Sequence, residues 1–171
     1  MPSIFTHAVV PAAIGRSARP AWLTGSVLAV GCFLAVLPDL DVVGFRLGIA
    51  YGAPWGHRGA THSLGFAAMV VGGLALMWRA ARCWPVAMFL LVSMASHGLL
   101  DMLTDGGKGV ALLWPLTNDR YFALLRPIRV SPIGARFLSA RGLETVVSEL
   151  TLVWLPSLAL LVLTKWRRKR S

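Results

Sequence analysis

The chain has 171 residues, of which 56% are hydrophobic and only 14% are charged, and its mean hydropathy is +0.67. This is too apolar for an ordinary soluble domain, because a soluble helical bundle would find too little polar sequence to cover its surface. The net charge of +10 would suit a nucleic-acid-binding protein, but no basic face with interleaved aromatic residues accompanies it, so this class is disfavoured as well.

The N-terminal stretch MPSIFTHAVV has no basic region followed by a long apolar run, and we expect no cleavable signal peptide. The segment FTHAVVPAAIG (5–15) is short for a full span and predicts a short N-terminal helix, packed in the bundle or lying at the interface. If it runs antiparallel to the first membrane helix, it places His7 at the end where that helix finishes.

Apolar blocks follow at Leu23–Leu37, Leu64–Trp78, Trp84–Ala95 and Leu152–Leu163. A bilayer core of ~30 Å requires about 20 helical residues, with a range of about 17–25, and each block reaches this range once its flanking residues are included. We therefore predict four membrane helices, at Ala18–Leu37, His62–Arg79, Cys83–Leu103 and Leu150–Trp166. The expected fold is an all-α, polytopic membrane bundle of about four spanning helices, a short N-terminal helix and interfacial helices, forming one domain.

Basic residues mark one end of every predicted span. They are Arg16 and Arg19 before the first, Arg79 and Arg82 after the second, and the tail Lys165–Arg170 after the last. Cytoplasmic loops carry such an excess of Lys and Arg. We predict a multi-pass membrane protein with its C-terminus in the cytoplasm.

A long loop, from Thr104 to Glu149, joins the third and fourth predicted helices. Long loops follow the charge rule only weakly, so its Lys and Arg residues leave the predicted orientation unchanged. A further interfacial helix is expected near Pro132–Ala140, and Trp114 and Tyr121 are interpreted as interface anchors.

This topology gathers three polar stretches at the outer face. They are LPDLD (37–41), HRGATHS (57–63) and SHGLLDMLTDGG (96–107), which hold four of the seven acids and three of the four histidines. Helical hairpins bring together side chains that are distant in sequence, so we expect one cluster.

Each stretch has a chemical interpretation beside a structural one. His97 and Asp101 share one helix face, because they are four residues apart. They are interpreted either as a pair of metal ligands or as partners in a structural His–Asp hydrogen bond that holds two helices together. Asp39 and Asp41 follow Pro38 at a helix C-terminus, where acids oppose the helix dipole, so either solvent or a divalent cation must compensate them.

The stretch 57–63 offers two imidazoles, His57 and His62, beside Arg58, which suits bidentate contacts to phosphate. Thr61 or Ser63 can cap the next helix, but a cap explains neither histidine. Considered together, the candidate ligands are His7, Asp39, Asp41, His57, His62, His97 and Asp101. Histidine with carboxylates suits Zn²⁺, with Mn²⁺ or Fe²⁺ as alternatives, and the number of ligands allows a second ion.

The motifs THxxxP, LPDxD, GHRGxTHS, SHxxxDxxTxGGKG, LWP and a late SEL extend over nearly the whole chain. Together they resemble the YdjM/YbcI family of bacterial inner-membrane proteins, which are described as membrane-bound metal-dependent hydrolases. The metal motif of that family is similar to the motif of zinc-dependent phospholipase C and of the single-strand nuclease of the same superfamily. These soluble enzymes are all-helical, and an Asp, a His and a His-xxx-Asp pair bind their zinc.

The resemblance implies that the ligands here are Asp39 or Asp41, His57 or His62, and the pair His97 and Asp101. The soluble enzymes also have ligands for other zinc ions, which this chain does not match beyond His7. The resemblance implies hydrolysis and names no substrate.

We therefore expect a membrane-bound hydrolase in which a metal-activated water attacks a phosphoester of a lipid or lipid-linked substrate. Asp39 or Asp41 would act as general base if it is not a ligand, and Arg58, with Lys108 or Arg120, would hold the phosphate. The alternative is a non-catalytic metal-binding membrane protein or a transporter. A transporter would place its polar residues near the middle of the bilayer, whereas here they gather at one end.

Overall fold

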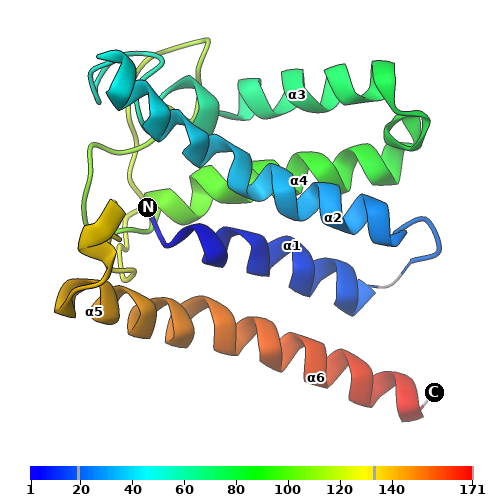
Figure 1. The fold of residues 1–171 in the computed structure, drawn as a ribbon. Coiled ribbons are helices and arrows are strands. Elements are labelled where there is room, and N and C mark those ends of the chain that lie inside the picture. The colour runs from blue at the N-terminus through cyan, green and yellow to red at the C-terminus, as the bar shows by residue number, and fades with distance from the viewer. Residues whose placement is uncertain (19, 133, 171) are drawn as a thin grey trace.

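The computed structural model describes residues 1–18, 20–132 and 134–170. In these residues the regular elements are helices, and the long ones run side by side along one axis (Figure 1). The α-helices are α1 (Ile4–Ala18), α2 (Gly25–Val36), α3 (Leu64–Met77), α4 (Trp84–Met102), α5 (Ala140–Glu149) and α6 (Leu155–Arg170). The all-α bundle predicted from the sequence is confirmed.

The first predicted span begins later and extends further than expected. The Thr24 hydroxyl accepts a hydrogen bond from Val27 N at 3.3 Å and caps α2 at Gly25, whereas Ala18 ends α1 and Arg19 lies outside the described residues. Beyond Val36 the chain continues through Pro38 as a 3₁₀ helix, η1 (Leu37–Leu47). The combined segment Gly25–Leu47 has 23 residues and is long and apolar enough to cross a membrane.

Two of the other three predicted spans reach membrane length. α4 has 19 residues, and α5, a π-helical turn η5 (Leu150–Trp154) and α6 form one segment, Ala140–Arg170, of 31 residues. This segment starts ten residues before the predicted Leu150, because the Ser139 hydroxyl caps α5 by accepting a hydrogen bond from Gly142 N.

The second predicted span is shorter than expected. α3 has 14 residues, a length of ~21 Å at 1.5 Å per residue, because Ser63 caps its start by accepting from Phe66 N at 2.9 Å. The 3₁₀ turns η2 (Ala60–His62) and η3 (Arg79–Arg82) flank it. The described residues therefore contain three segments of membrane length and one shorter apolar helix.

The interfacial helix expected near Pro132–Ala140 is a single 3₁₀ turn, η4 (Gly134–Phe137). Ile133, in the same predicted helix, lies outside the described residues.

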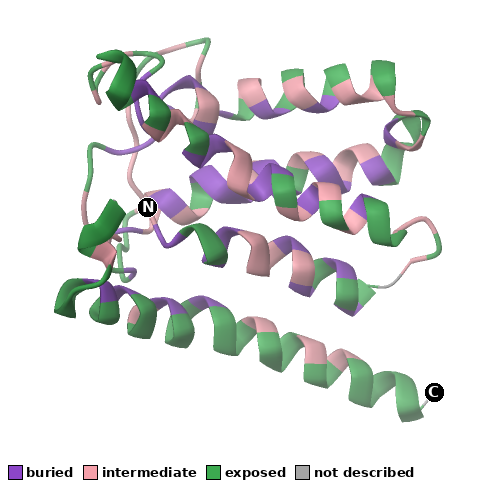
Figure 2. Ribbon diagram, in the orientation of Figure 1, coloured by how far each residue is buried: buried purple, intermediate pink, exposed green. Residues whose placement is uncertain are grey.

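Apolar residues occupy both the centre and the outside of the bundle. α2, α3 and α4 pack around a core that includes Val27, Leu34, Leu90 and Met94. Large apolar side chains are also exposed on α3 and along α6 (Figure 2), as expected for helices that face lipid.

The two ends of the bundle differ in chemistry. The α1–α2 connection, the α3–α4 connection and the chain's C-terminus lie together at one end (Figure 1). We call it the basic end, because Arg16, Arg79, Arg82 and the tail Lys165–Arg170 belong to these segments. The opposite end carries the N-terminus, η1 and the long loops, and holds the candidate site.

Candidate metal centre

The three polar stretches that the sequence predicted to converge do meet, and His7 joins them from α1. Seven side chains form one buried cluster: His7, Asp39, Asp41, His57, His62, His97 and Asp101. His7 stacks on His97 with the ring centroids 3.7 Å apart. His7, His97 and Asp101 are fully buried, so their polar atoms depend on one another.

His97 is oriented by the backbone of α2. Its Nδ1 donates a hydrogen bond to the carbonyl oxygen of Ala35 at 2.7 Å, so in the neutral ring Nε2 carries the lone pair. That Nε2 lies 3.0 Å from His62 Nε2 and 3.3 Å from Asp39 Oδ1.

His62 is oriented in the same way by a carboxylate. Its Nδ1 lies 3.2 Å from Asp41 Oδ2, and Asp41 also accepts hydrogen bonds from the Thr61 hydroxyl at 2.9 Å and from Arg58 N at 3.2 Å. The other oxygen of Asp41 lies 2.6 Å from His57 Nδ1. A carboxylate behind a histidine is the usual arrangement around a metal-binding imidazole, because it fixes the tautomer and leaves the far nitrogen available.

Two histidines held in this way direct their Nε2 atoms at each other. Two lone pairs 3.0 Å apart repel, so a proton or a cation must lie close to both nitrogens. Burial lowers the pKa of His62, but its contacts with Asp101, Asp39 and Asp41 outweigh burial and raise the pKa to about 10. A proton can therefore occupy this position near neutral pH.

A proton on His62 leaves other buried atoms without partners. Both carboxylate oxygens of Asp39 and of Asp101, and both ring nitrogens of His7, are buried and form no hydrogen bond within the described residues, although Asp101 Oδ2 forms an ion pair with Arg58 Nε at 3.0 Å. His7 Nε2 lies 3.9 Å from Asp39 Oδ2 and 3.7 Å from Asp101 Oδ1, and His62 Nε2 lies 3.4 Å from Asp101 Oδ2. Orphaned polar atoms of this kind are costly, and a cation among them would satisfy several at once.

Three overlapping groups have ligand atoms within 4.8 Å of one another: His7, Asp39 and His97; Asp39, His57 and His62; and His62, His97 and Asp101. Besides histidines, the cationic groups within ion-pair distance of Asp39, Asp41 or Asp101 among the described residues are Arg58 and, at 3.8 Å from Asp101, the amino group of Met1. Donor type, burial and charge therefore make this cluster a possible divalent-metal site.

Arg58 lies inside the protein and not at the surface of the site. Its side chain is fully buried, its φ is 63°, and its Nε forms an ion pair with Asp101 Oδ2 at 3.0 Å. Its other two nitrogens donate to the carbonyl oxygen of Gly106 and to the Thr104 hydroxyl, both at 2.8 Å. In this arrangement the guanidinium holds Asp101 and the following loop.

The other two residues predicted to hold phosphate lie outside the cluster. Arg120 donates to the carbonyl oxygens of His57, Tyr51 and Ala53 at 2.9–3.1 Å, and so secures the loop that carries His57. Lys108 is exposed, with its Nζ 5.7 Å from the centroid of the Tyr51 ring.

The sequence reasoning missed a buried acid next to α1. Glu149 accepts hydrogen bonds from the backbone N and hydroxyl of Ser3 and, at 2.6 Å, from the Thr6 hydroxyl. Trp154 Nε1 donates to the same hydroxyl of Thr6 at 2.8 Å. These contacts fix the first turn of α1 and hence His7. A carboxylate at the start of an apolar span was the available signal, because such positions are rarely charged without a function.

Comparison with known proteins agrees with this architecture. A family described as YdjM inner membrane protein matches residues 1–170. The inner membrane protein YbcI of Escherichia coli (strain K12) is 43% identical over 176 residues, which cover 99% of this chain and 100% of that protein. No solved structure matches the chain.

Proposed function

The chain belongs to the YdjM inner membrane protein family, and on this premise we propose that it is a membrane-bound, metal-dependent hydrolase. It would act on a phosphoester of a lipid or lipid-linked substrate. The observation that carries the proposal is a set of buried atoms without a hydrogen bond within the described residues, those of His7, of Asp39 and Oδ1 of Asp101, around the facing Nε2 atoms of His62 and His97.

The proposed ligands are Asp39, His62, His97 and Asp101, with His7 beside them. Asp39 is preferred to Asp41 because Asp41 already accepts three hydrogen bonds, whereas Asp39 accepts none. Zn²⁺ suits this donor set, and Mn²⁺ or Fe²⁺ are alternatives. Four protein ligands still leave room for substrate where the ion is five- or six-coordinate.

An apolar pocket beside Asp39 supports an amphiphilic substrate. It has a volume of about 230 Å³, and among its lining residues are Ile4, Phe5, Val42, Phe137 and Asp39. A pocket that is lined mainly by apolar side chains and includes a proposed metal ligand in its wall suits a hydrocarbon chain beside a reacting headgroup better than it suits a nucleotide.

A divalent ion bound in this cluster would lower the pKa of a coordinated water to about 7 and polarise a phosphoryl group. The residues of the chain would prepare this chemistry. Asp41 would orient His57 and His62, with the Asp41–His57 pair as the proton acceptor. Arg58 would hold Asp101 in place, and Arg120 would fix the loop behind His57.

The proposed metal content is tested on detergent-purified protein by elemental analysis. We expect a nearly stoichiometric divalent metal, and we expect His97→Ala to lose most of it. Arg79→Ala, at the basic end, is the matched control and should retain it. The proposal would be contradicted if the purified protein contained no metal, or if His97→Ala retained the full metal content.

Catalysis is tested separately from metal binding. The metal-loaded protein should release phosphate or a phosphorylated headgroup from a panel of phospholipids and lipid phosphates, and removal of the metal by a chelator should abolish the release. Metal-loaded protein that turns over none of the panel but carries the ion into proteoliposomes would instead establish the alternative, a transporter.

A further inference from the structure

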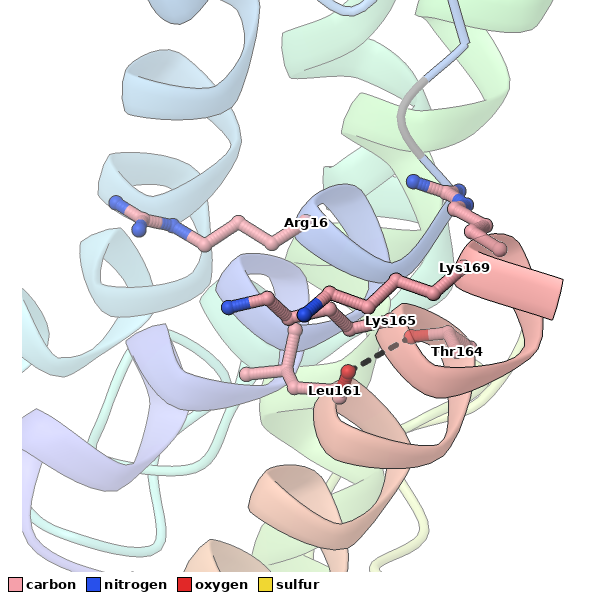
Figure 3. Close-up of a pocket in the computed structure, with 6 residues that line it drawn as sticks. Arg16, Leu161, Thr164, Lys165 and Lys169 are labelled. Atoms are coloured by element: carbon pink, nitrogen blue, oxygen red, sulfur yellow. Dashed lines mark hydrogen bonds between the residues drawn. The ribbon is translucent and has the colours of Figure 1, made fainter.

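A second polar site lies at the basic end, far from the His/Asp cluster. A pocket of about 360 Å³ opens between the last turn of α1 and the last turns of α6 (Figure 3). Its lining residues are Arg16, Leu161, Thr164, Lys165, Arg168 and Lys169. Four of these six are basic, so the pocket has a strongly positive potential.

Within the described part of the chain, the four cations have no carboxylate as an ion-pair partner. No carboxylate among the described residues forms an ion pair with Arg16, Lys165, Arg168 or Lys169. Arg168 donates to the carbonyl oxygens of Ser17 and Ala18, and so ties the end of α6 to the end of α1. Lys165 and Lys169 extend from α6 in one direction, and Arg16 extends from α1 over the same side (Figure 3).

An apolar groove adjoins this basic pocket. The groove has a volume of about 290 Å³ and shares Arg16 and Leu161 with the pocket. Its other lining residues come from α1 (Val9, Ala12, Ala13) and from the segment that includes α6 (Leu150, Trp154, Leu155, Ser157, Leu158). From Leu161 to Leu150 it extends along the helix for ~16 Å at 1.5 Å per residue.

We propose that the basic pocket and the apolar groove together form a binding site for an anionic phospholipid. The phosphate would lie among Arg16, Lys165 and Lys169, and one acyl chain would lie in the groove against α1 and α6. Basic pockets between membrane helices recognise anionic headgroups, and a free phosphate would make no use of the groove. The site lies at the opposite end from the metal cluster, so its lipid is an independent ligand and not the proposed substrate.

The headgroup is tested by native mass spectrometry on the full-length protein in detergent. We titrate dioleoyl phosphatidylglycerol against dioleoyl phosphatidylcholine and expect a clear preference for the former. Each basic side chain near an anionic lipid contributes about five-fold in affinity, so Arg16→Ala combined with Lys165→Ala should weaken phosphatidylglycerol binding roughly 25-fold. Arg79→Ala, at the same end but outside the pocket, should leave it unchanged.

The groove is tested with Ala12→Phe, which fills part of it and leaves all four basic residues of the pocket in the sequence. This variant should weaken binding of the dioleoyl lipid and leave that of dihexanoyl phosphatidylglycerol unchanged. His97→Ala, which removes a proposed metal ligand, should bind the dioleoyl lipid like the unaltered chain.

Three results would overturn the lipid site. They are equal binding of the two headgroups, unchanged binding in the Arg16/Lys165 variant, and displacement of the dioleoyl lipid by millimolar inorganic phosphate, which would identify a simple anion site. Circular dichroism of the Arg16/Lys165 and Ala12→Phe variants shows whether each retains its helices. The surface variant at Arg16 and Lys165 tests the proposal even where Ala12→Phe does not fold.

Discussion

Asp39 and Asp41 stand two residues apart in η1, yet their carboxylates face different neighbours. A 3₁₀ helix has three residues per turn, so side chains at i and i+2 point about 120° apart. Asp41 therefore meets His57 and Thr61 at 2.6 and 2.9 Å, while Asp39 faces His97 and accepts no hydrogen bond. The geometry of η1 separates a proposed ligand from a residue that orients ligands.

This separation predicts unequal effects of two matched substitutions. Asp41→Asn removes the carboxylate behind His57 and His62, and we expect metal affinity to fall about 10–100-fold, as for other residues that orient a ligand. Asp39→Asn removes a proposed ligand and should leave the purified protein with little metal. Titration against a chelating dye measures both affinities. A larger loss in Asp41→Asn than in Asp39→Asn would reverse the assignment.

Protonation of His62 predicts proton release when metal binds. The pKa of His62, raised to about 10, leaves the metal-free ring charged at pH 7, whereas a ligand must offer a lone pair. Metal affinity should thus rise about ten-fold per pH unit below pH 10. In the metal-free protein the charge of protonated His62 also stabilises the fold. This stabilisation is complete below about pH 6.5, the pKa of histidine in the unfolded chain. It is lost as the pH rises through about 10, the pKa of His62 in the folded protein.

The measurement is calorimetric titration with metal at pH 7 in buffers of different ionisation enthalpy. The observed heat should depend on the buffer with a slope of about one released proton. A slope of zero in the unaltered chain would refute the protonated state of His62.

At the scale of elements, α4 and η2 approach each other closely at Gly98. A Cβ atom at this position would lie 2.5 Å from the carbonyl oxygen of His62, which is too close for any side chain without movement of the backbone. The absence of a side chain at Gly98 thus lets the turn that carries His62 lie against the neighbouring His97.

We predict that Gly98→Ala weakens metal binding and destabilises the fold by about 1–3 kcal/mol, the usual cost of overpacking. Gly72→Ala in α3 is the control, because a Cβ there meets nothing within 4 Å and Ala favours the helix by up to about 1 kcal/mol. Thermal unfolding followed by circular dichroism, with metal analysis of the same samples, checks both variants. Equal behaviour of the two variants would contradict this role of Gly98.

The sequence was informative wherever a local rule decides the structure. Periodicity placed His97 and Asp101 on one face of α4, Ser63 was, beside Thr61, one of the two residues recognisable as a helix cap, and alternating spans brought the polar stretches to one end. The 3₁₀ extension beyond Pro38 could not be anticipated, because η1 depends on its packing against η2 and α4. The burial of Arg58 could not be anticipated either. It depends on a loop that returns more than 40 residues later in the sequence and presents Thr104 and Gly106 to the guanidinium.

At the scale of the whole molecule, the two ends of the bundle carry opposite chemistry. The basic end holds Arg16, Arg79, Arg82 and the C-terminal tail, whereas the His/Asp cluster lies at the other end, and lipid-facing apolar side chains separate them on α3 and α6. Since basic ends of membrane helices remain in the cytoplasm, we expect the cluster to face the periplasm.

A native cysteine allows a direct test of this orientation. Cys83 is exposed at the start of α4, next to Arg82 at the basic end, and Asn118 is exposed in the loop that Arg120 ties to His57 at the cluster end. In a background with Cys32→Ala, a membrane-impermeant maleimide added to spheroplasts should leave Cys83 unlabelled until the membrane is opened.

With Cys83→Ala also in place, Asn118→Cys should be labelled in intact spheroplasts. The reverse pattern would place the cluster in the cytoplasm, where a periplasmic lipid could not reach it. Labelling of both positions before the membrane is opened would show that the two ends do not lie on opposite sides of a bilayer. Both cysteines are exposed and are labelled by the same reagent in the folded protein. The comparison therefore depends on which side of the membrane each end of the bundle occupies.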